Sequence, residues 1–378
     1  MLILAAILAI FVYGMIAAML GTILPDLSQR FKFTPKQNGT IAFCQALGLI
    51  LASLSVGPLL DNEGNKVGLV LGLGLITLSL LLLPRSTGFS TVAFYLFLLG
   101  VGGGIIVVAA NKLAYEINPD NSGTNLLLVN LFFGLGGLAT PFISANLLKR
   151  NSMYLLYTVA AFTGIALLVN VATPMPGPTG AKHFVFSQVG SLLGATELWL
   201  LCFFLFLYVA SEVGVWNWLA QHLIAQGIPE SRALNILSLG FALGILVGRV
   251  GVSQVLKSYK DLDLTVTLVA SICMAIFTFL MLKTRNATAA GVLVFLAGVA
   301  MAPVFPTTLS IVGHAFESMK GTATGIVVTF GWIGLAVSSR IIGQIAGGDP
   351  KRLKKALLLL PGMAVLMIAV NLALHAIR

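Results

Sequence analysis

Long apolar runs separated by short polar segments dominate this sequence. Of its 378 residues, 58% are hydrophobic and 9% are charged, whereas a soluble domain carries roughly a quarter charged residues. A helix of roughly 20 apolar residues crosses a hydrocarbon core of about 30 Å, and lipid offers no partner to an unpaired backbone amide. The pattern therefore predicts a helical integral membrane protein and excludes a water-soluble fold.

We expect each apolar run to form one transmembrane helix. The twelve runs cover residues 2–24, 40–60, 67–84, 91–115, 124–147, 153–173, 196–219, 233–256, 264–282, 289–312, 322–346 and 354–376. A cleavable signal peptide is the rival interpretation of the first run. No basic segment precedes that run and it is too long, so we interpret it as a helix.

An internal repeat predicts two similar halves. Phe133–Ala139 reads Phe-Gly-Leu-Gly-Gly-Leu-Ala and Phe330–Ala336 reads Phe-Gly-Trp-Ile-Gly-Leu-Ala, so five of seven positions agree at an offset of 197. Phe11-Val-Tyr13 and Phe206-Leu-Tyr208 match at a similar offset. We thus predict an all-α protein with two six-helix bundles, residues 1–173 and 196–378, joined by a proline-containing loop at 174–195.

The loop after the second run reads Gly57-Pro-Leu-Leu-Asp61-Asn-Glu-Gly64-Asn-Lys66. It resembles the loop signature of the major facilitator superfamily, although Asn62 and Asn65 stand where that family usually has arginine. The resemblance implies a carrier that works by alternating access, with a solute path between the two bundles near the bilayer midplane.

Three further segments, Ala109–Asn111, Leu128–Gly136 and Leu207–Trp216, are similar to the fucose/galactose/glucose permease-type group of sugar:proton symporters. This resemblance implies a monosaccharide as the solute. The carboxylates that a proton-coupled fucose permease uses align here with Gly21 and Val107. Coupling therefore stays open between proton symport through Glu212 and facilitated diffusion.

Glu212 is the only acidic residue near the middle of a predicted span. A charge there costs about 2.5–3.5 kcal/mol on insertion scales, so intramembrane carboxylates usually mark a transport pathway. Trp216 lies one turn later on the same helix face, and Asn217 is adjacent. An indole beside a carboxyl and an amide suits the apolar face and hydroxyl rim of a sugar. The alternative for Glu212 is a structural carboxyl paired with a neighbouring helix.

Other intramembrane residues could contact the same solute. Trp332 lies inside the repeated Phe-Gly segment rather than at a membrane interface. The remaining candidates are hydrogen-bonding side chains from five runs: Gln45, Asn111, Asn130, Asn235 and Thr308. Each could instead join two helices, which contributes about 0.6–2 kcal/mol.

The superfamily resemblance also implies a gate. Asp61 would cap a helix N-terminus across the halves, and Arg249 would pair with an acid when that face is closed. The candidate gating residues are Gly57, Asp61, Glu116, Arg249, Glu317 and Arg340. A static structural role is the alternative for these charges.

Neither an enzyme nor a metal or cofactor site is expected, because no His, Cys or Ser lies near a second catalytic group. The coupling ion would be H⁺ or Na⁺. The net charge of +10 fits lipid headgroups better than nucleic acid, because the basic residues lie mostly in short loops. The expected partners are a small solute and the bilayer, and we expect a monomer. The alternative functions are a multidrug or metabolite exporter and a receptor or scaffold without transport.

The resemblance places the chain in the inner (cell) membrane with both termini in the cytoplasm. On that basis 7 of the 22 Lys and Arg residues lie in cytoplasmic segments, 13 lie outside, and Arg249 and Arg340 lie in the membrane, which is the opposite of the positive-inside rule. We give the loop signature more weight, because span ends that are misplaced by a few residues move several of these charges.

Overall fold

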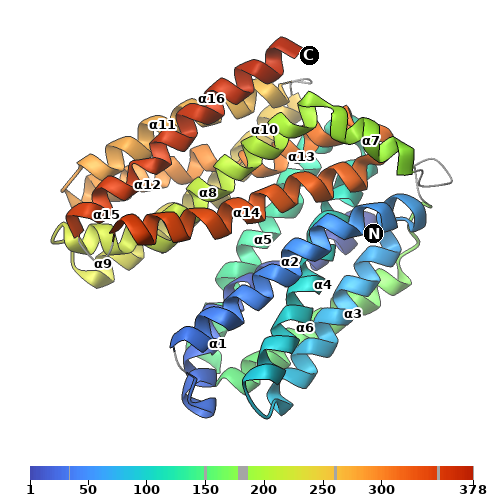
Figure 1. Ribbon diagram of the computed structural model, residues 1–378, viewed down its shortest axis with the longest axis horizontal. Helices are drawn as coiled ribbons and strands as arrows, with labels where there is room; N and C mark the ends of the chain where they lie inside the picture. The colour runs from blue at the N-terminus through green and yellow to red at the C-terminus, as the bar shows by residue number, and fades with distance from the viewer. Residues whose placement is uncertain (34, 149–150, 178–185, 259–261, 347–349, 378) are drawn as a thin grey trace. The chain divides into compact units, whose positions relative to one another are not determined.

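The computed structural model describes residues 1–33, 35–148, 151–177, 186–258, 262–346 and 350–377. The regular structure in these ranges is helical (Figure 1). Twelve segments there are long and apolar enough to cross a membrane. A helix satisfies its own backbone amides, which is the condition for lying in lipid. The all-α prediction and the expected number of spans are confirmed.

Contacts within the chain divide it into two units. Unit 1 contains Met1–Gln188 and Ala315–Thr329, and unit 2 contains Val189–His314 and Phe330–Arg378. The first boundary falls inside the segment that the sequence assigns to the linker, residues 174–195. The second falls inside helix α14 (Lys320–Ala346), which therefore gives its first turns to unit 1 and the rest to unit 2.

Unit 1 contains six long helices. These are α1 (Leu2–Phe31), α2 (Pro35–Glu63), α3 (Asn65–Leu82), α4 (Phe89–Ile117), α5 (Ser122–Phe142) and α6 (Ser152–Ala172). Helix α1 packs against α5, α2 packs against α4, and α3 packs against α4 and α6. Asn151 fixes where α6 begins, because its side-chain oxygen accepts hydrogen bonds from the backbone amides of Met153 and Tyr154 at 3.0 and 3.1 Å.

The helices of the second half are more interrupted. They are α7 (Phe186–Gly194), α8 (Thr196–Ala225), α9 (Glu230–Asn235), the π-helical segment η4 (Ile236–Ala242), α10 (Leu243–Ser258), α11 (Asp263–Lys283), α12 (Ala287–Met301), α13 (Val304–Ala315), α14, α15 (Pro350–Leu357) and α16 (Leu359–Ile377). In unit 2, α16 packs against α8 and α11, and α12 packs against α10, η4 and α11.

Proline explains two of the interruptions. The run expected at 289–312 is broken between α12 and α13, next to Pro303, and the run at 354–376 is broken at Leu358, ahead of Pro361. Proline has no amide hydrogen and its ring clashes with the carbonyl four residues earlier. The segment expected as a loop at 174–195 also contains a helix, α7, while residues 178–185 lie outside the described part.

Glycines bring α2 and α4 into backbone contact in unit 1. A Cβ atom at Gly100 would lie 2.0 Å from the carbonyl oxygen of Gln45, and a Cβ atom at Gly48 would lie 2.2 Å from that of Phe97. Such a pair of small residues lets two helices approach more closely than side chains permit. The packing of α2 on α4 therefore depends on glycine at both positions.

The same arrangement recurs in unit 2. A Cβ atom at Gly244 would lie 2.3 Å from the carbonyl oxygen of Phe295, and one at Gly298 would lie 2.5 Å from that of Phe241. Gly244 and Gly298 follow Gly48 and Gly100 at about the 197-residue offset of the sequence repeat. The two glycine pairs are thus equivalent contacts in the two units.

The repeated Phe-Gly segments also pack alike. Gly136 of α5 meets the backbone of Phe11 in α1, where a Cβ atom would lie 2.0 Å from the carbonyl oxygen. Gly334 of α14 meets the backbone of Phe206 in α8, with a corresponding distance of 2.4 Å. The internal repeat seen in the sequence is therefore also a repeat of helix packing.

Replacing Gly100 with alanine should prevent close packing of α2 on α4. Overpacking usually costs about 1–3 kcal/mol, and here the clash is with backbone that cannot rotate away. We expect Gly100→Ala to lose monodisperse protein at lower temperature than wild type, as measured by size-exclusion chromatography of heated, detergent-purified samples. Gly74→Ala is the matched control, since a Cβ atom at Gly74 meets nothing within 4 Å. Equal stability of Gly100→Ala and wild type would contradict this packing.

Candidate functional site

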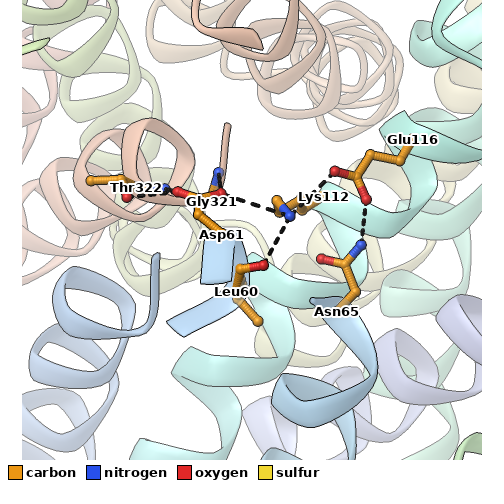
Figure 2. A network of polar contacts seen from close by, with 7 residues as sticks. All are labelled: Leu60, Asp61, Asn65, Lys112, Glu116, Gly321 and Thr322. Atoms are coloured by element: carbon orange, nitrogen blue, oxygen red, sulfur yellow. Dashed lines mark hydrogen bonds and ion pairs between the residues drawn. The ribbon is translucent and has the colours of Figure 1, made fainter. Parts of the chain in front are cut away.

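The carboxylate of Asp61 caps the start of α14. Asp61 lies in the last turn of α2, and its Oδ1 accepts a hydrogen bond from the Gly321 amide at 2.9 Å (Figure 2). Its Oδ2 accepts hydrogen bonds from the amide and hydroxyl of Thr322, at 2.9 and 2.7 Å. The first amides of a helix have no partner in the helix itself, and the helix dipole favours a negative charge there. All three residues belong to unit 1.

Glycine makes this approach possible. A Cβ atom at Gly57, one turn before Asp61, would lie 2.4 Å from the Cα atom of Thr322. Gly64 has a φ angle of 83°, a conformation that L-residues with side chains seldom adopt, and it separates α2 from α3. The two glycines of the loop signature thus set how near Asp61 comes to α14 and how tightly the chain turns after it.

A buried lysine connects Asp61 to a second carboxylate. Lys112 of α4 is 3% exposed. Its Nζ lies 3.7 Å from Asp61 Oδ1 and 3.2 Å from Glu116 Oε1, and it donates a hydrogen bond to the Leu60 carbonyl at 3.2 Å. Asn65 donates a hydrogen bond to the other oxygen of Glu116 at 2.6 Å. Figure 2 shows these side chains converging from α2, α3 and α4.

Lys112 is absent from the site expected from the sequence. It is four residues before Glu116, a spacing that places two side chains on one helix face, so a signal for the pair was present. Its contact with Asp61 joins residues 51 positions apart, which no local pattern indicates.

Two of the expected solute-binding residues hydrogen-bond to each other. Asn130 of α5 donates to the side-chain oxygen of Asn111 in α4 at 2.7 Å. Each amide also donates to its own helix, Asn111 to Val107 at 2.7 Å and Asn130 to Leu126 at 2.9 Å. Asn111 and Asn130 are 2% and 5% exposed. In this structure the pair therefore joins α4 to α5, which is the alternative that the sequence left open for them.

Glu212 lies in a polar and aromatic cluster on one face of α8. Tyr208, Glu212 and Trp216 follow one another at intervals of four, so their side chains form a stripe. Tyr208 and Trp216 lie beside the carboxylate, and the Arg249 guanidinium of α10 is near enough to attract it electrostatically. The contact with Tyr208 is loose, because its buried hydroxyl has no partner at standard hydrogen-bond geometry.

The position of Arg249 changes how the expected residues group. The sequence predicts a gating role for Arg249 and a solute-binding role for Glu212. In the structure the two side chains interact with each other within unit 2. Arg249 is 4% exposed. A buried guanidinium beside a carboxylate offsets part of the cost of keeping either charge in the membrane.

An aromatic surface adjoins this cluster. The Trp216 indole is 37% exposed and meets the ring of Phe241 edge-to-face, with centroids 5.1 Å apart and an interplanar angle of 75°. Asn217, the next residue, is exposed. The stripe on α8 therefore presents a partly open indole beside charged and amide groups.

The other expected residues are spread over both units. Gln45 and Trp332 are partly buried, and Asn235, Glu317 and Arg340 are exposed. Thr308 is fully buried and donates to the Val304 carbonyl of its own helix at 2.7 Å. Gln45, Asn111 and Asn130 belong to unit 1, whereas Glu212, Trp216, Asn217, Asn235, Thr308 and Trp332 belong to unit 2. A single site that combines the two sets stays a prediction, as does the gating role of the charged residues.

No group of three His, Cys, Asp or Glu side chains within the described ranges is arranged to hold a metal ion. The three cysteines, Cys44, Cys202 and Cys273, are free thiols. The polar chemistry described above is that of hydrogen bonding and charge pairing between helices.

The family model described as the Major Facilitator Superfamily matches residues 6–339. The chain belongs to the Major Facilitator Superfamily. It is therefore a multi-pass membrane transporter and not an enzyme. The superfamily expected from the loop at Gly57–Lys66 is confirmed.

Relatives of this superfamily member match along nearly its whole length. It is 23% identical to the glucose/mannose transporter GlcP of Bacillus subtilis, over 97% of this chain and 92% of the relative. It is 25% identical to a glucose/galactose transporter of Brucella abortus, over 90% and 86%. The solved structure of FucP, a Major Facilitator Superfamily transporter in the outward conformation, covers 98% of both chains with a TM-score of 0.85 and 17% identity. That structure shares the fold.

Proposed function

We propose that this transporter carries a monosaccharide or a similar small polyol across the cell membrane by alternating access. Two relatives named as hexose transporters support the solute class, since each aligns with 90% or more of this chain. The stripe of Tyr208, Glu212 and Trp216 on α8 supports the place of binding.

The chemistry of that stripe carries the proposal. A pyranose has an apolar ring face and a rim of hydroxyl groups. The partly exposed Trp216 indole offers a flat surface for the ring, and the Glu212 carboxylate offers two strong acceptors for hydroxyl hydrogens. Arg249 and Tyr208 add donors beside it. A purely hydrophobic solute would leave these polar groups unpaired on binding, at a cost for each.

We further propose that transport is coupled to H⁺ through Glu212. Among the described residues, Glu212 is the acidic side chain that lies near the middle of a candidate span, Thr196–Ala225. Protonation of Glu212 would remove its attraction to Arg249, so the two protonation states make different contacts. A ligand can shift a conformational equilibrium only through such a difference between states.

Glu212→Gln should abolish accumulation against a gradient. The amide keeps the shape and an acceptor oxygen but takes up no proton, so we expect exchange of labelled hexose between equal concentrations to persist. An imposed proton gradient, acid outside, should stimulate uptake at least about tenfold in wild-type proteoliposomes and not in the variant. Asn217→Gln, next to Trp216, is the control for an altered amide at the same site. Equal uptake by wild type with and without the gradient would identify facilitated diffusion and contradict the coupling.

The orientation belongs to the same proposal. An even number of spans puts both termini on one side, and we propose that this side and the loop around Gly64 are cytoplasmic, in a monomer of the inner (cell) membrane. The Lys and Arg distribution opposes this, so the proposal rests on the superfamily loop signature.

A reporter at the C-terminus tests the orientation. We expect a fused green fluorescent protein to fluoresce and a fused alkaline phosphatase to be inactive, because the first folds in the cytoplasm and the second only outside it. An active phosphatase fusion at the C-terminus, together with an inactive one in the loop after Lys283, would place the termini outside the cytoplasm and contradict the proposed orientation.

A further inference from the structure

Helix α15 has two chemically different faces. Its residues Leu353, Ala356 and Leu357 are 5%, 1% and 0% exposed. The other side chains that follow its first proline are all basic: Lys351, Arg352, Lys354 and Lys355. An α-helix turns by about 100° per residue, which puts the basic side chains on the face opposite the buried apolar ones.

Helix α15 packs on the last turns of α8. Lys354 lies close enough to His222 of α8 to interact with it electrostatically. Leu360, just after α15, packs on Gly214, two turns earlier in α8, where a Cβ atom would lie 2.4 Å from the leucine Cδ2 atom. The apolar face of an amphipathic helix at a membrane usually enters lipid, but here the protein covers it. The bundle therefore holds the basic face in a defined place.

This end of unit 2 lies at a membrane surface. The candidate spans Thr196–Ala225 and Asp263–Lys283 end here, and the span Lys351–Ile377 begins here. The side-chain amide of Gln226, just after α8, donates a hydrogen bond to the Leu282 carbonyl at 3.5 Å, which joins the ends of α8 and α11. Figure 1 shows α9 and α15 at this same end of α8. The basic face of α15 is therefore at the level where lipid headgroups meet water.

Positive charge is in excess at this end. Three further basic side chains are exposed there: Arg232, Lys283 and Arg285. The segments that meet here are 226–235, 282–288 and 349–358. Together they contain seven Lys and Arg residues and two acidic ones, Glu230 and Asp349, so five positive charges remain even if both acids are paired. In the proposed orientation these seven are more than half of the Lys and Arg residues on the outer side, so the exception to the positive-inside rule is concentrated here.

The spacing of the cations on α15 favours a bound anion. Lys351 is three residues before Lys354 and four before Lys355, and like charges at these spacings repel each other and destabilise a helix. An anion between them removes that repulsion. Phosphate suits the group, because a guanidinium such as that of Arg352 matches two phosphate oxygens and lysine ammonium groups add point charges.

An apolar stripe continues from α15 into the membrane. Leu358, Val365 and Leu372 follow one another at intervals of seven, which keeps them on one side of α16, and they are 43%, 56% and 53% exposed. Fourteen residues of helix span about 21 Å, which is comparable with the length of a lipid acyl chain. A free phosphate ion has no use for this stripe, whereas a phospholipid does.

We propose that the basic face of α15 binds the headgroup of an anionic phospholipid, whose acyl chain lies along the apolar stripe of α16. The lipid neutralises the excess charge at this end of unit 2 and holds α15 at the membrane surface. Lys351 and Arg352 also interact within the chain, so Lys354 and Lys355 are the pair to replace in a test. The proposal is independent of which solute the protein carries.

The test measures which lipid stays on the purified protein. The full chain in detergent is incubated with an equimolar mixture of phosphatidylglycerol and phosphatidylcholine that have the same acyl chains, and native mass spectrometry counts the lipids retained. We expect wild type to retain phosphatidylglycerol at least about fivefold over phosphatidylcholine, and Lys354→Gln with Lys355→Gln to lose most of that preference. Lys354→Arg with Lys355→Arg should keep it. Lys32→Gln with Arg85→Gln is the matched control, since it removes two exposed positive charges from unit 1 and should behave as wild type.

Three results would overturn the proposal. The first is equal retention of the two lipids by wild type, and the second is an equal loss of preference in the control variant, which would make net charge the cause. The third is loss of the bound lipid in excess inorganic phosphate, which would identify a site for soluble anions. A measurement on wild type alone covers the case in which the glutamine variant does not fold: a photoactivatable phosphatidylglycerol should cross-link to residues 350–372, and cross-links confined to unit 1 would contradict the site.

Discussion

Lipid supplies no hydrogen-bond partner, and this absence determines most of what the structure does with its polar groups. The backbone satisfies itself by forming helices. Polar side chains follow the same rule: Thr308 bonds to a carbonyl of its own helix, Asn111 bonds to Asn130, and Lys112 lies between Asp61 and Glu116. A polar group that keeps a partly open face, such as Glu212 beside Trp216, is therefore the exception that points to a solute.

The same constraint explains the use of glycine. Lipid tails are as apolar as leucine, so helices gain little from burying apolar surface against each other and associate through close packing instead. The paired contacts at Gly48 and Gly100, repeated at Gly244 and Gly298, hold helices within each unit by backbone contact. Gly57, by contrast, lies against the backbone of Thr322 at the start of α14, where Asp61 accepts hydrogen bonds from the first amides of that helix.

The sequence predicts the large features because they are local. Each span is a continuous apolar run, and the repeat of Phe133–Ala139 in Phe330–Ala336 indicates two similar bundles, which the glycine contacts of Phe11 and Phe206 match. Pro303 and Pro361 are local signals for the two interruptions, because proline disfavours the helix interior. The sequence alone does not decide the outcome, because membrane helices often continue past a proline.

The partners of polar side chains could not be predicted, because they depend on which helices meet. The sequence predicts Asn111 and Asn130 as separate solute ligands, whereas in the structure they hydrogen-bond to each other. It predicts different roles for Arg249 and Glu212, whereas in the structure these two side chains attract each other. Lys112 was missed for the same reason. Its contact with Asp61 exists only when α2 packs on α4, and nothing in the residues around Lys112 indicates that contact.

The central claim is that the stripe of Tyr208, Glu212 and Trp216 holds a sugar, and equilibrium binding of radiolabelled hexoses to the purified protein tests it most directly. We expect saturable binding that Trp216→Ala weakens at least about tenfold, because a flat aromatic wall contributes much of the contact with a pyranose. Trp199→Ala is the matched control, since Trp199 packs against Phe330 and bonds to the Leu193 carbonyl on the same helix bundle. The account predicts wild-type affinity for Trp199→Ala. Unchanged hexose affinity in Trp216→Ala would contradict it.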